Sequence, residues 1–183
     1  MSLVVFTGGA RSGKSAAAQE LAAARSRDGA RVVVAVFGQP IDQEMHTRIE
    51  RHRTDRPDHF ETIEATEASS WVAAVPDGAL LVVDCLGTLL GLLMDEEQEP
   101  DRVRSRFDEL VGWMIRRAGD TIVVTNEVGE GVVPAYESGR VFRDILGHSN
   151  RTLVNEADRA YLVVCGRLVE LTRMTRHAAW PSD

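Results

Sequence analysis

The chain has 183 residues, of which 44% are hydrophobic and 27% charged, a composition typical of one soluble domain. Its formal net charge of −7 argues against nucleic acid or an anionic membrane as the main partner, because both repel an acidic surface. No apolar run approaches the roughly 20 residues that span a bilayer and no signal peptide precedes the first strand pattern, so we expect a cytoplasmic protein.

The first half of the chain alternates short apolar runs with helix-forming segments. The apolar runs predict buried strands over Leu3–Thr7, Arg31–Phe37 and Ala79–Asp84, with a short extended piece at Glu61–Glu64. Composition and capping residues predict helices over Ser15–Arg27, Asp42–Arg53, Glu67–Val75 and Leu86–Met94.

The second half continues this alternation after an acidic linker at residues 95–101. Strands are predicted over Thr121–Thr125 and Ala160–Cys165, with a last short strand after Gly166. Helices are predicted over Arg102–Ala118 and over Gly139–Asp158, the latter broken at Gly147. The whole pattern predicts one α/β domain over residues 1–183, with a mostly parallel central sheet and helices on both faces.

A glycine-rich segment between the first strand and the first helix matches G-x-x-x-x-G-K-[ST], the sequence of a nucleotide-binding phosphate loop. In such a loop, backbone amides and the helix N-terminus hold phosphate oxygens, the lysine reaches the β- and γ-phosphates, and the last hydroxyl binds Mg²⁺. A glycine-rich turn without a ligand is the alternative, which the flanking strand and helix disfavour. The predicted nucleotide-binding residues are Gly8, Gly9, Ala10, Arg11, Ser12, Gly13, Lys14 and Ser15.

Lys14 stands out because the 21 basic residues are 20 arginines and this one lysine. A compact ammonium group suits a phosphate site that needs a point charge, whereas a planar guanidinium does not. We therefore predict that Lys14 is catalytic as well as nucleotide-binding. The N-K-x-D guanine motif of ordinary GTPases needs a further lysine and is absent. The phosphate loop alone leaves nucleoside kinases and shikimate-like kinases open.

Two acidic residues follow core strands, at the edge of a parallel sheet where ligands bind. Asp84 ends the third core strand and is predicted to bind Mg²⁺ together with Ser15; the alternative is that it caps the next helix. Glu127 and its neighbour Asn126 follow the fourth core strand. We predict that Glu127 contacts the nucleotide, with capping of its own loop as the alternative.

Two further motifs follow the phosphate loop, and the three together resemble one enzyme family. Residues 42–53 read DQEMHTRIERHR, and residues 126–134 read NEVGEGVVP, with Asn150 and Asp158 downstream. In this order, over Leu3 to Val164, the motifs are similar to those of the bifunctional adenosylcobinamide kinase/adenosylcobinamide-phosphate guanylyltransferases (the CobU/CobP family) of cobalamin biosynthesis.

The resemblance implies a RecA-like P-loop fold, a homotrimer and two successive reactions. The hydroxyl of the aminopropanol arm of adenosylcobinamide first takes a phosphate from ATP or GTP. A histidine then attacks GTP, which releases pyrophosphate and leaves a guanylyl-histidine. Adenosylcobinamide phosphate finally accepts the GMP and becomes adenosylcobinamide-GDP.

The family motif places this histidine at His52. On the helix predicted there, Met45 and Ile49 share a face with His52, whereas His46 projects about 100° away. An imidazole suits nucleotidyl transfer because its neutral form is a nucleophile at physiological pH. The residues alone favour a buried structural histidine, and the resemblance favours the nucleophile. The nearby arginines, among them Arg53, are predicted to bind the triphosphate, with solvated pairing to local acids as the alternative.

Two other functions remain open from the sequence. The first is a small-molecule P-loop kinase that forms no covalent nucleotide. The second is a nucleotide-binding regulator or chaperone with slow hydrolysis and a protein partner. Covalent labelling by GTP distinguishes the first from the bifunctional enzyme, and turnover with adenosylcobinamide distinguishes the second.

Overall fold

A computed structural model describes residues 1–37 and 57–174 of the chain. Its centre is a seven-stranded sheet in the order β3-β2-β4-β5-β1-β6-β7. All neighbouring strands run parallel except β7, which pairs antiparallel with β6. The strands are β1 (Leu3–Thr7), β2 (Val32–Phe37), β3 (Glu61–Ala65), β4 (Leu80–Asp84), β5 (Thr121–Val124), β6 (Arg159–Val164) and β7 (Arg167–Glu170).

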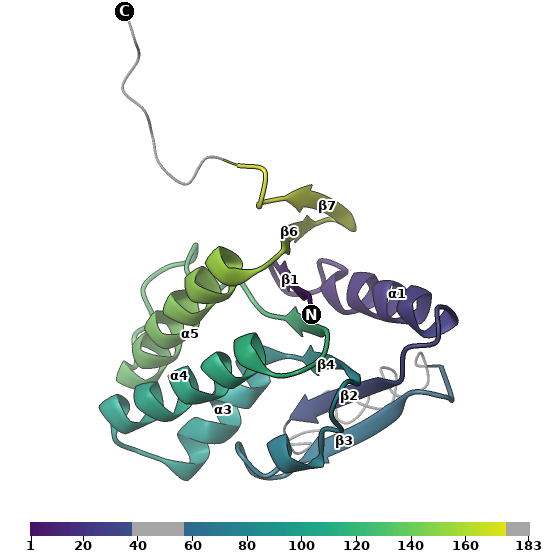
Figure 1. The fold of residues 1–183 in the computed structure, drawn as a ribbon. Coiled ribbons are helices and arrows are strands. Elements are labelled where there is room, and N and C mark those ends of the chain that lie inside the picture. Colours follow the sequence, from purple (N-terminus) through teal and green to yellow (C-terminus); the bar gives the residue numbers. More distant parts are fainter. Residues whose placement is uncertain (38–56, 175–183) are drawn as a thin grey trace, which may run out of the picture.

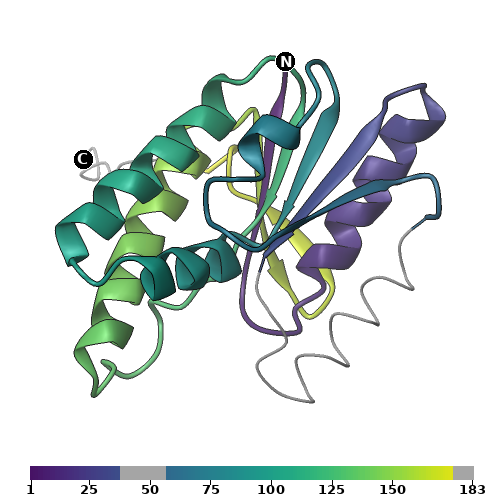
Figure 2. The same ribbon diagram turned by 90° about the horizontal axis from the view of Figure 1, so that it is seen from below.

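Helices cover both faces of this sheet (Figure 1). One face carries α1, and the other carries α3, α4 and α5, as the view along the sheet also shows (Figure 2). This arrangement confirms the predicted α/β class, the mostly parallel sheet and the helices on both faces. The helices are α1 (Lys14–Arg27), α3 (Leu86–Glu96), α4 (Pro100–Arg116) and α5 (Glu137–Glu156), with a short 3₁₀ turn η1 (Val72–Ala74). Within residues 1–37 and 57–174, no helix has the length and hydropathy needed to cross a membrane.

The two faces of the sheet are packed differently. Under α1 the contact is made by small side chains, since Ala18 and Ala22 are fully buried in one apolar cluster with Phe6 and Val124. Alanines let the helix backbone approach the sheet closely, which fixes the position of the loop that precedes α1. The opposite face buries larger side chains, among them Leu86, Leu89, Leu90, Leu93 and Phe107.

The helix predicted over Glu67–Val75 is wrong, because only the turn η1 forms there. Trp71 is 1% exposed and packs edge-on against the rings of Phe37 and Trp113. Its indole N–H donates to the carbonyl of Ala68 at 2.8 Å, a local bond that competes with regular helix hydrogen bonding. Burial of one large aromatic ring therefore outweighs the helix propensity of this segment.

Two predicted helix boundaries also need correction. The break at Gly147 is wrong, because α5 runs unbroken from Glu137 to Glu156. A glycine is tolerated there because the neighbouring residues Ile145 and Leu146 are buried and hold the helix on the sheet. The acidic linker is shorter than predicted, since α3 continues to Glu96 and α4 begins at Pro100.

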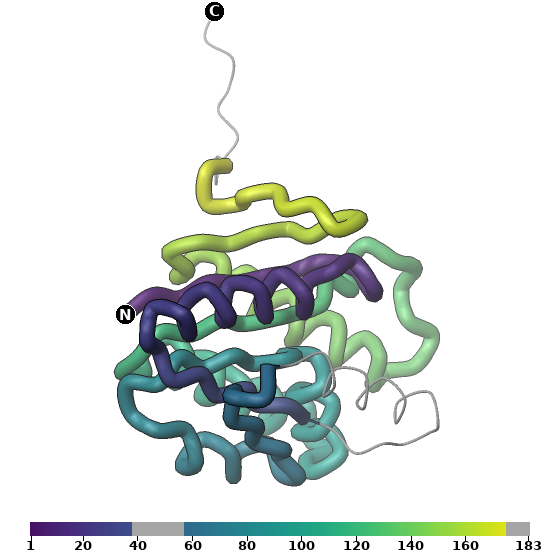
Figure 3. The backbone as a smooth tube through the Cα atoms, turned by 90° about the vertical axis from the view of Figure 1, so that its right-hand side faces the viewer, coloured from purple at the N-terminus to yellow at the C-terminus, as the bar shows by residue number. Residues whose placement is uncertain are grey.

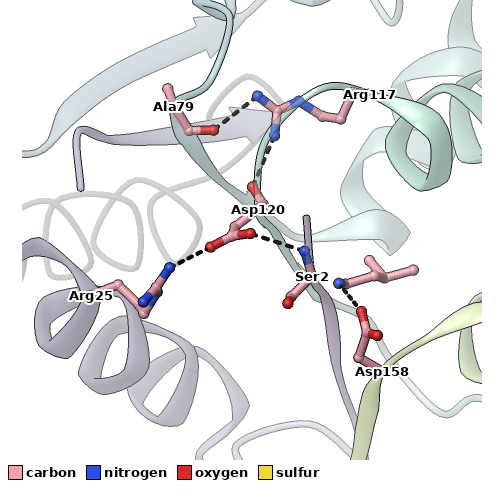
Figure 4. Close-up of polar contacts among 7 residues, drawn as sticks. Ser2, Arg25, Ala79, Arg117, Asp120 and Asp158 are labelled. Atoms are coloured by element: carbon pink, nitrogen blue, oxygen red, sulfur yellow. Dashed lines mark hydrogen bonds and ion pairs between the residues drawn. The ribbon is translucent and has the colours of Figure 1, made fainter. Parts of the chain in front are cut away.

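Carboxylates anchor the amino-terminal edge of the sheet (Figure 4). Asp120 accepts hydrogen bonds from the backbone N–H of Ser2 at 2.9 Å and from the guanidinium of Arg25 at 2.7 Å. The hydrogen bond from Arg25 lowers the pKa of Asp120 below its ordinary value. On the other side of β1, Asp158 accepts the backbone N–H of Leu3 at 2.8 Å. The amino end of β1 and the carboxyl end of α1 are thus tied to their neighbours, and these two elements flank the phosphate loop.

Arg117 lies at the same edge and is 8% exposed. Its guanidinium donates to the carbonyls of Asp120 at 2.8 Å and Ala79 at 2.9 Å (Figure 4). It also lies 5.8 Å from the ring centre of Trp113. Burial lowers the pKa of Arg117, yet the two carbonyls and the ring provide the contacts that a buried guanidinium requires.

Candidate functional site

The glycine-rich segment forms the connection between β1 and α1, at the carboxyl edge of the sheet. Gly8 and Gly13 have φ angles of 149° and 102°, which side-chain-bearing residues rarely adopt. A Cβ atom at Gly8 would also collide with the carbonyl oxygen of Val163. Both glycines are therefore required by the path of the backbone. The exposed Arg11 also has a positive φ, of 57°.

Two neighbouring segments hold this loop in place. The backbone N–H of Gly166, in the turn between β6 and β7, donates to the carbonyl of Ser12 at 2.8 Å. The backbone N–H of Glu127, just after β5, donates to the carbonyl of Gly8 at 3.0 Å. All three segments lie at one edge of the sheet, on the right-hand side of Figure 3. The loop is thus fixed from both sides.

Lys14 begins α1 and is 7% exposed. Its ammonium folds back over the loop and donates to the carbonyl of Gly9 at 2.7 Å. Two hydroxyl oxygens nearby, Ser12 Oγ and Thr7 Oγ1, are buried and have no hydrogen-bond partner among residues 1–37 and 57–174. Buried hydroxyl groups of this kind require a partner, and phosphate oxygens would accept from them. The residues present therefore fit a bound polyphosphate.

The structure brings Ser15 and Asp84 together from separate elements. Ser15 is in the first turn of α1 and Asp84 ends β4, yet the Ser15 hydroxyl donates to the Asp84 carboxylate at 3.1 Å. Mg²⁺ in nucleotide sites takes one or two protein oxygens and completes its shell with phosphate oxygens and water. The pair fits such an ion. The described part of the chain contains no cluster of three or more acidic, histidine or cysteine side chains that would bind a metal unaided.

Glu127 lies beside the loop but points its carboxylate into its own segment. The side chain accepts the backbone N–H of Gly129 at 2.9 Å, which is the loop-capping interaction that we considered as the alternative. The connection from Glu127 to the phosphate loop is made by its backbone, through Gly8.

The structure also contains a buried hydrogen-bond network that our sequence prediction missed. Asn150 is 6% exposed and joins the Thr125 hydroxyl, at 2.6 Å, to the Asn126 carbonyl, at 2.9 Å. Asn150 lies on the buried face of α5, between Leu146 and Leu153. An amide within an apolar helix stripe was the sequence signal for a buried hydrogen-bonded position.

His52 and Arg53, the predicted nucleophile and triphosphate ligand, lie outside the described residues, as does His46. The described site thus consists of the phosphate loop with Lys14 and Ser15, the carboxylate of Asp84, and the polar residues at the end of β5.

Comparison with known proteins identifies relatives that align with about nine-tenths of the chain. Residues 4–171 match the model of the family described as cobinamide kinase / cobinamide phosphate guanyltransferase (CobU). The bifunctional adenosylcobalamin biosynthesis protein CobU of Escherichia coli K12 is 33% identical over an alignment of 178 residues, and the match covers 90% of this chain and 96% of that protein. CobU of Salmonella typhimurium is 35% identical, with the same two coverages of 90% and 96%. CobP of Pseudomonas aeruginosa is 37% identical, covering 88% of this chain and 92% of its own.

Among solved structures, a KaiC-like protein from Pyrococcus horikoshii OT3 aligns with a TM-score of 0.49 and 14% identity. The alignment covers 88% of this chain and 70% of that one.

Proposed function

The chain belongs to the cobinamide kinase / cobinamide phosphate guanyltransferase family, and we propose that its phosphate loop serves both reactions. It is an enzyme of cobalamin biosynthesis, with adenosylcobinamide kinase and adenosylcobinamide-phosphate guanylyltransferase activity. The observation that carries the assignment to this site is the arrangement of Lys14, Ser15 and Asp84 around a loop with unpaired buried hydroxyl groups.

In the kinase step, the loop amides and the Lys14 ammonium bind the β- and γ-phosphates of ATP or GTP. The hydroxyl oxygen of adenosylcobinamide attacks the γ-phosphorus, the bond to the β–γ bridging oxygen breaks, and ADP or GDP leaves while the hydroxyl proton passes to solvent. Lys14 stabilises the negative charge on the transferring group, because its buried charge is weakly screened. Ser15 and Asp84 would hold Mg²⁺, which neutralises phosphate charge when bound.

In the transferase step, the imidazole of His52 attacks the α-phosphorus of GTP and pyrophosphate leaves. A phosphate oxygen of adenosylcobinamide phosphate then attacks the same phosphorus, and the bond to the imidazole breaks. The support for His52 is its position in the motif at residues 44–53, since it lies outside the described residues. Arg53 is proposed to neutralise the phosphates of the incoming GTP.

We further propose a cytoplasmic homotrimer whose residues 1–183 form one domain. The support is the resemblance to the family and a set of exposed apolar side chains. Val132 is 96% exposed and Tyr136 is 81% exposed on the loop after β5, and Leu168 is 51% exposed on the edge strand β7. Exposed apolar groups of this size are typical of surfaces that bind another molecule.

The test is the intact mass of the protein after incubation with Mg²⁺ and GTP. The wild type and His46→Asn are expected to gain one GMP, whereas His52→Asn gains none and keeps kinase turnover with adenosylcobinamide. A phosphoramidate is acid-labile, so brief acid treatment should remove the added mass. Labelling that persists in His52→Asn but disappears in His46→Asn would move the nucleophile to His46. No labelling of any variant, with kinase turnover intact, would favour a plain kinase.

A further inference from the structure

Asn126 follows the strand that lies between the phosphate-loop strand and the strand that ends at Asp84. Strand β5 lies between β1, which leads into the phosphate loop, and β4, which ends at Asp84. Val124 is in register with Phe6 on one side and with Asp84 on the other. Asn126 follows two residues later, at the level of Gly8, just beyond the carboxyl edge of the sheet.

Both oxygens of Asn126 are held by neighbouring residues. Its backbone carbonyl accepts the side-chain N–H of Asn150 at 2.9 Å, and Asn150 is itself fixed by the hydroxyl of the fully buried Thr125 at 2.6 Å. Its side-chain Oδ1 accepts the thiol of Cys85 at 3.5 Å. Because the Cys85 thiol donates to the oxygen of the side-chain amide, the amide nitrogen points away from Cys85.

The Nδ2 group of Asn126 takes no part in these contacts. It carries two N–H donors and has no hydrogen-bond partner within residues 1–37 and 57–174. Asn126 is half-buried, so solvent and ligand can reach this group. A neutral donor fixed on a rigid strand end suits a phosphate oxygen, since such a bond to a charged acceptor is roughly twice as strong as a neutral one.

We propose that Asn126 donates a hydrogen bond to the γ-phosphate of the bound nucleoside triphosphate and that Asn150 is its positioning residue. The inference rests on the proposed phosphate-binding function of the loop. A contact to the γ-phosphate distinguishes a triphosphate from a diphosphate, because ADP and GDP lack that group. Asn126 therefore contributes to release of the diphosphate product as well as to binding of the substrate.

The experiment is calorimetric titration with Mg²⁺ and either β,γ-methylene-ATP or ADP. Asn126→Ala should weaken binding of the triphosphate analogue about tenfold or more while ADP binding stays unchanged. Asn126→Asp, of nearly the same shape, should weaken it further, because a carboxylate repels the γ-phosphate. Unchanged ADP binding also shows that the variants are folded. An unchanged ratio of the two affinities in both variants would overturn the inference.

The role of Asn150 is tested by Asn150→Asp, which keeps an acceptor for Thr125 but loses the donor to the Asn126 carbonyl. When introduced into the wild type, Asn150→Asp should lower the ratio of the affinity for β,γ-methylene-ATP to the affinity for ADP. When introduced into Asn126→Ala, it should leave this ratio unchanged. Ser149→Ala is the matched control, since the Ser149 hydroxyl is buried on the same helix and has no partner among the described residues. Equal weakening of both ligands by Asn150→Asp would overturn the positioning role. A wild type that binds neither nucleotide would instead contradict the phosphate-loop function itself.

Discussion

Replacement of Arg117 by methionine tests how strongly the amino-terminal edge of the sheet is anchored. The substitution keeps most of the apolar stem but removes the donors to the carbonyls of Ala79 and Asp120. The Ala79 carbonyl then loses its hydrogen-bond partner, whereas the Asp120 carbonyl keeps the backbone N–H of Leu81. Because one buried carbonyl left without a partner costs about 1–3 kcal/mol, we expect the free energy of unfolding to fall by about 1–3 kcal/mol. The loss of packing on Trp113 is smaller, because methionine also packs well on aromatic rings.

The assay is urea unfolding followed by tryptophan fluorescence, with Arg116→Met as the matched control. Arg116 is adjacent in sequence but exposed, so its substitution should change the unfolding free energy by less than about 0.5 kcal/mol. Nucleotide affinity at low urea should be unchanged in both variants, since the residues lie at the edge opposite the phosphate loop. If Arg117→Met is no less stable than Arg116→Met, the reasoning from the unsatisfied Ala79 carbonyl is wrong.

Three further predictions concern the loop and its anchors. Lys14→Ala should abolish measurable binding of ATP and GTP in calorimetry, and Lys14→Arg should not restore it, because the planar head does not fit a point-charge site; unchanged affinity would refute the assignment. Gly8→Ala should also reduce nucleotide affinity strongly, since its Cβ meets the Val163 carbonyl, and wild-type affinity would show that the loop can relax. Asp120 has a lowered pKa in the folded state, so the stability it contributes is present above its ordinary pKa and lost as the pH falls through the lowered value. Asp120→Asn should therefore be less stable than the wild type at about pH 7, with the difference shrinking by about pH 3 in parallel urea titrations, and a constant difference would contradict the linkage.

The elements around the phosphate loop could be predicted because local and global signals agree there. Leu3–Thr7 is a continuous apolar run and forms β1 with those bounds, and the helix after it differs from the prediction by one residue. The predicted pair of Ser15 and Asp84 is close in the structure, because strands of a parallel sheet end at a common edge.

Other features could not be predicted because they depend on partners distant in sequence. The segment at Glu67–Val75 has helix-forming residues, but Trp71 finds its pocket between Phe37 and Trp113. The hydrogen bonds of Asn150 join α5 to the end of β5, and no local pattern reveals that pairing.

The position of β1 determines when during synthesis the site can form. Leu3 pairs with Thr121 and Val4 pairs with Arg159, so β1 acquires both neighbours only after the chain has been made as far as β6. Such long-range parallel pairings close slowly, because the entropy of a large loop is lost before the contacts form. A nascent chain that ends before β6 has the complete glycine-rich sequence but lacks the strand and turn that shape it. The capacity to bind a nucleotide is therefore acquired only after β6 and the turn that follows it have been made.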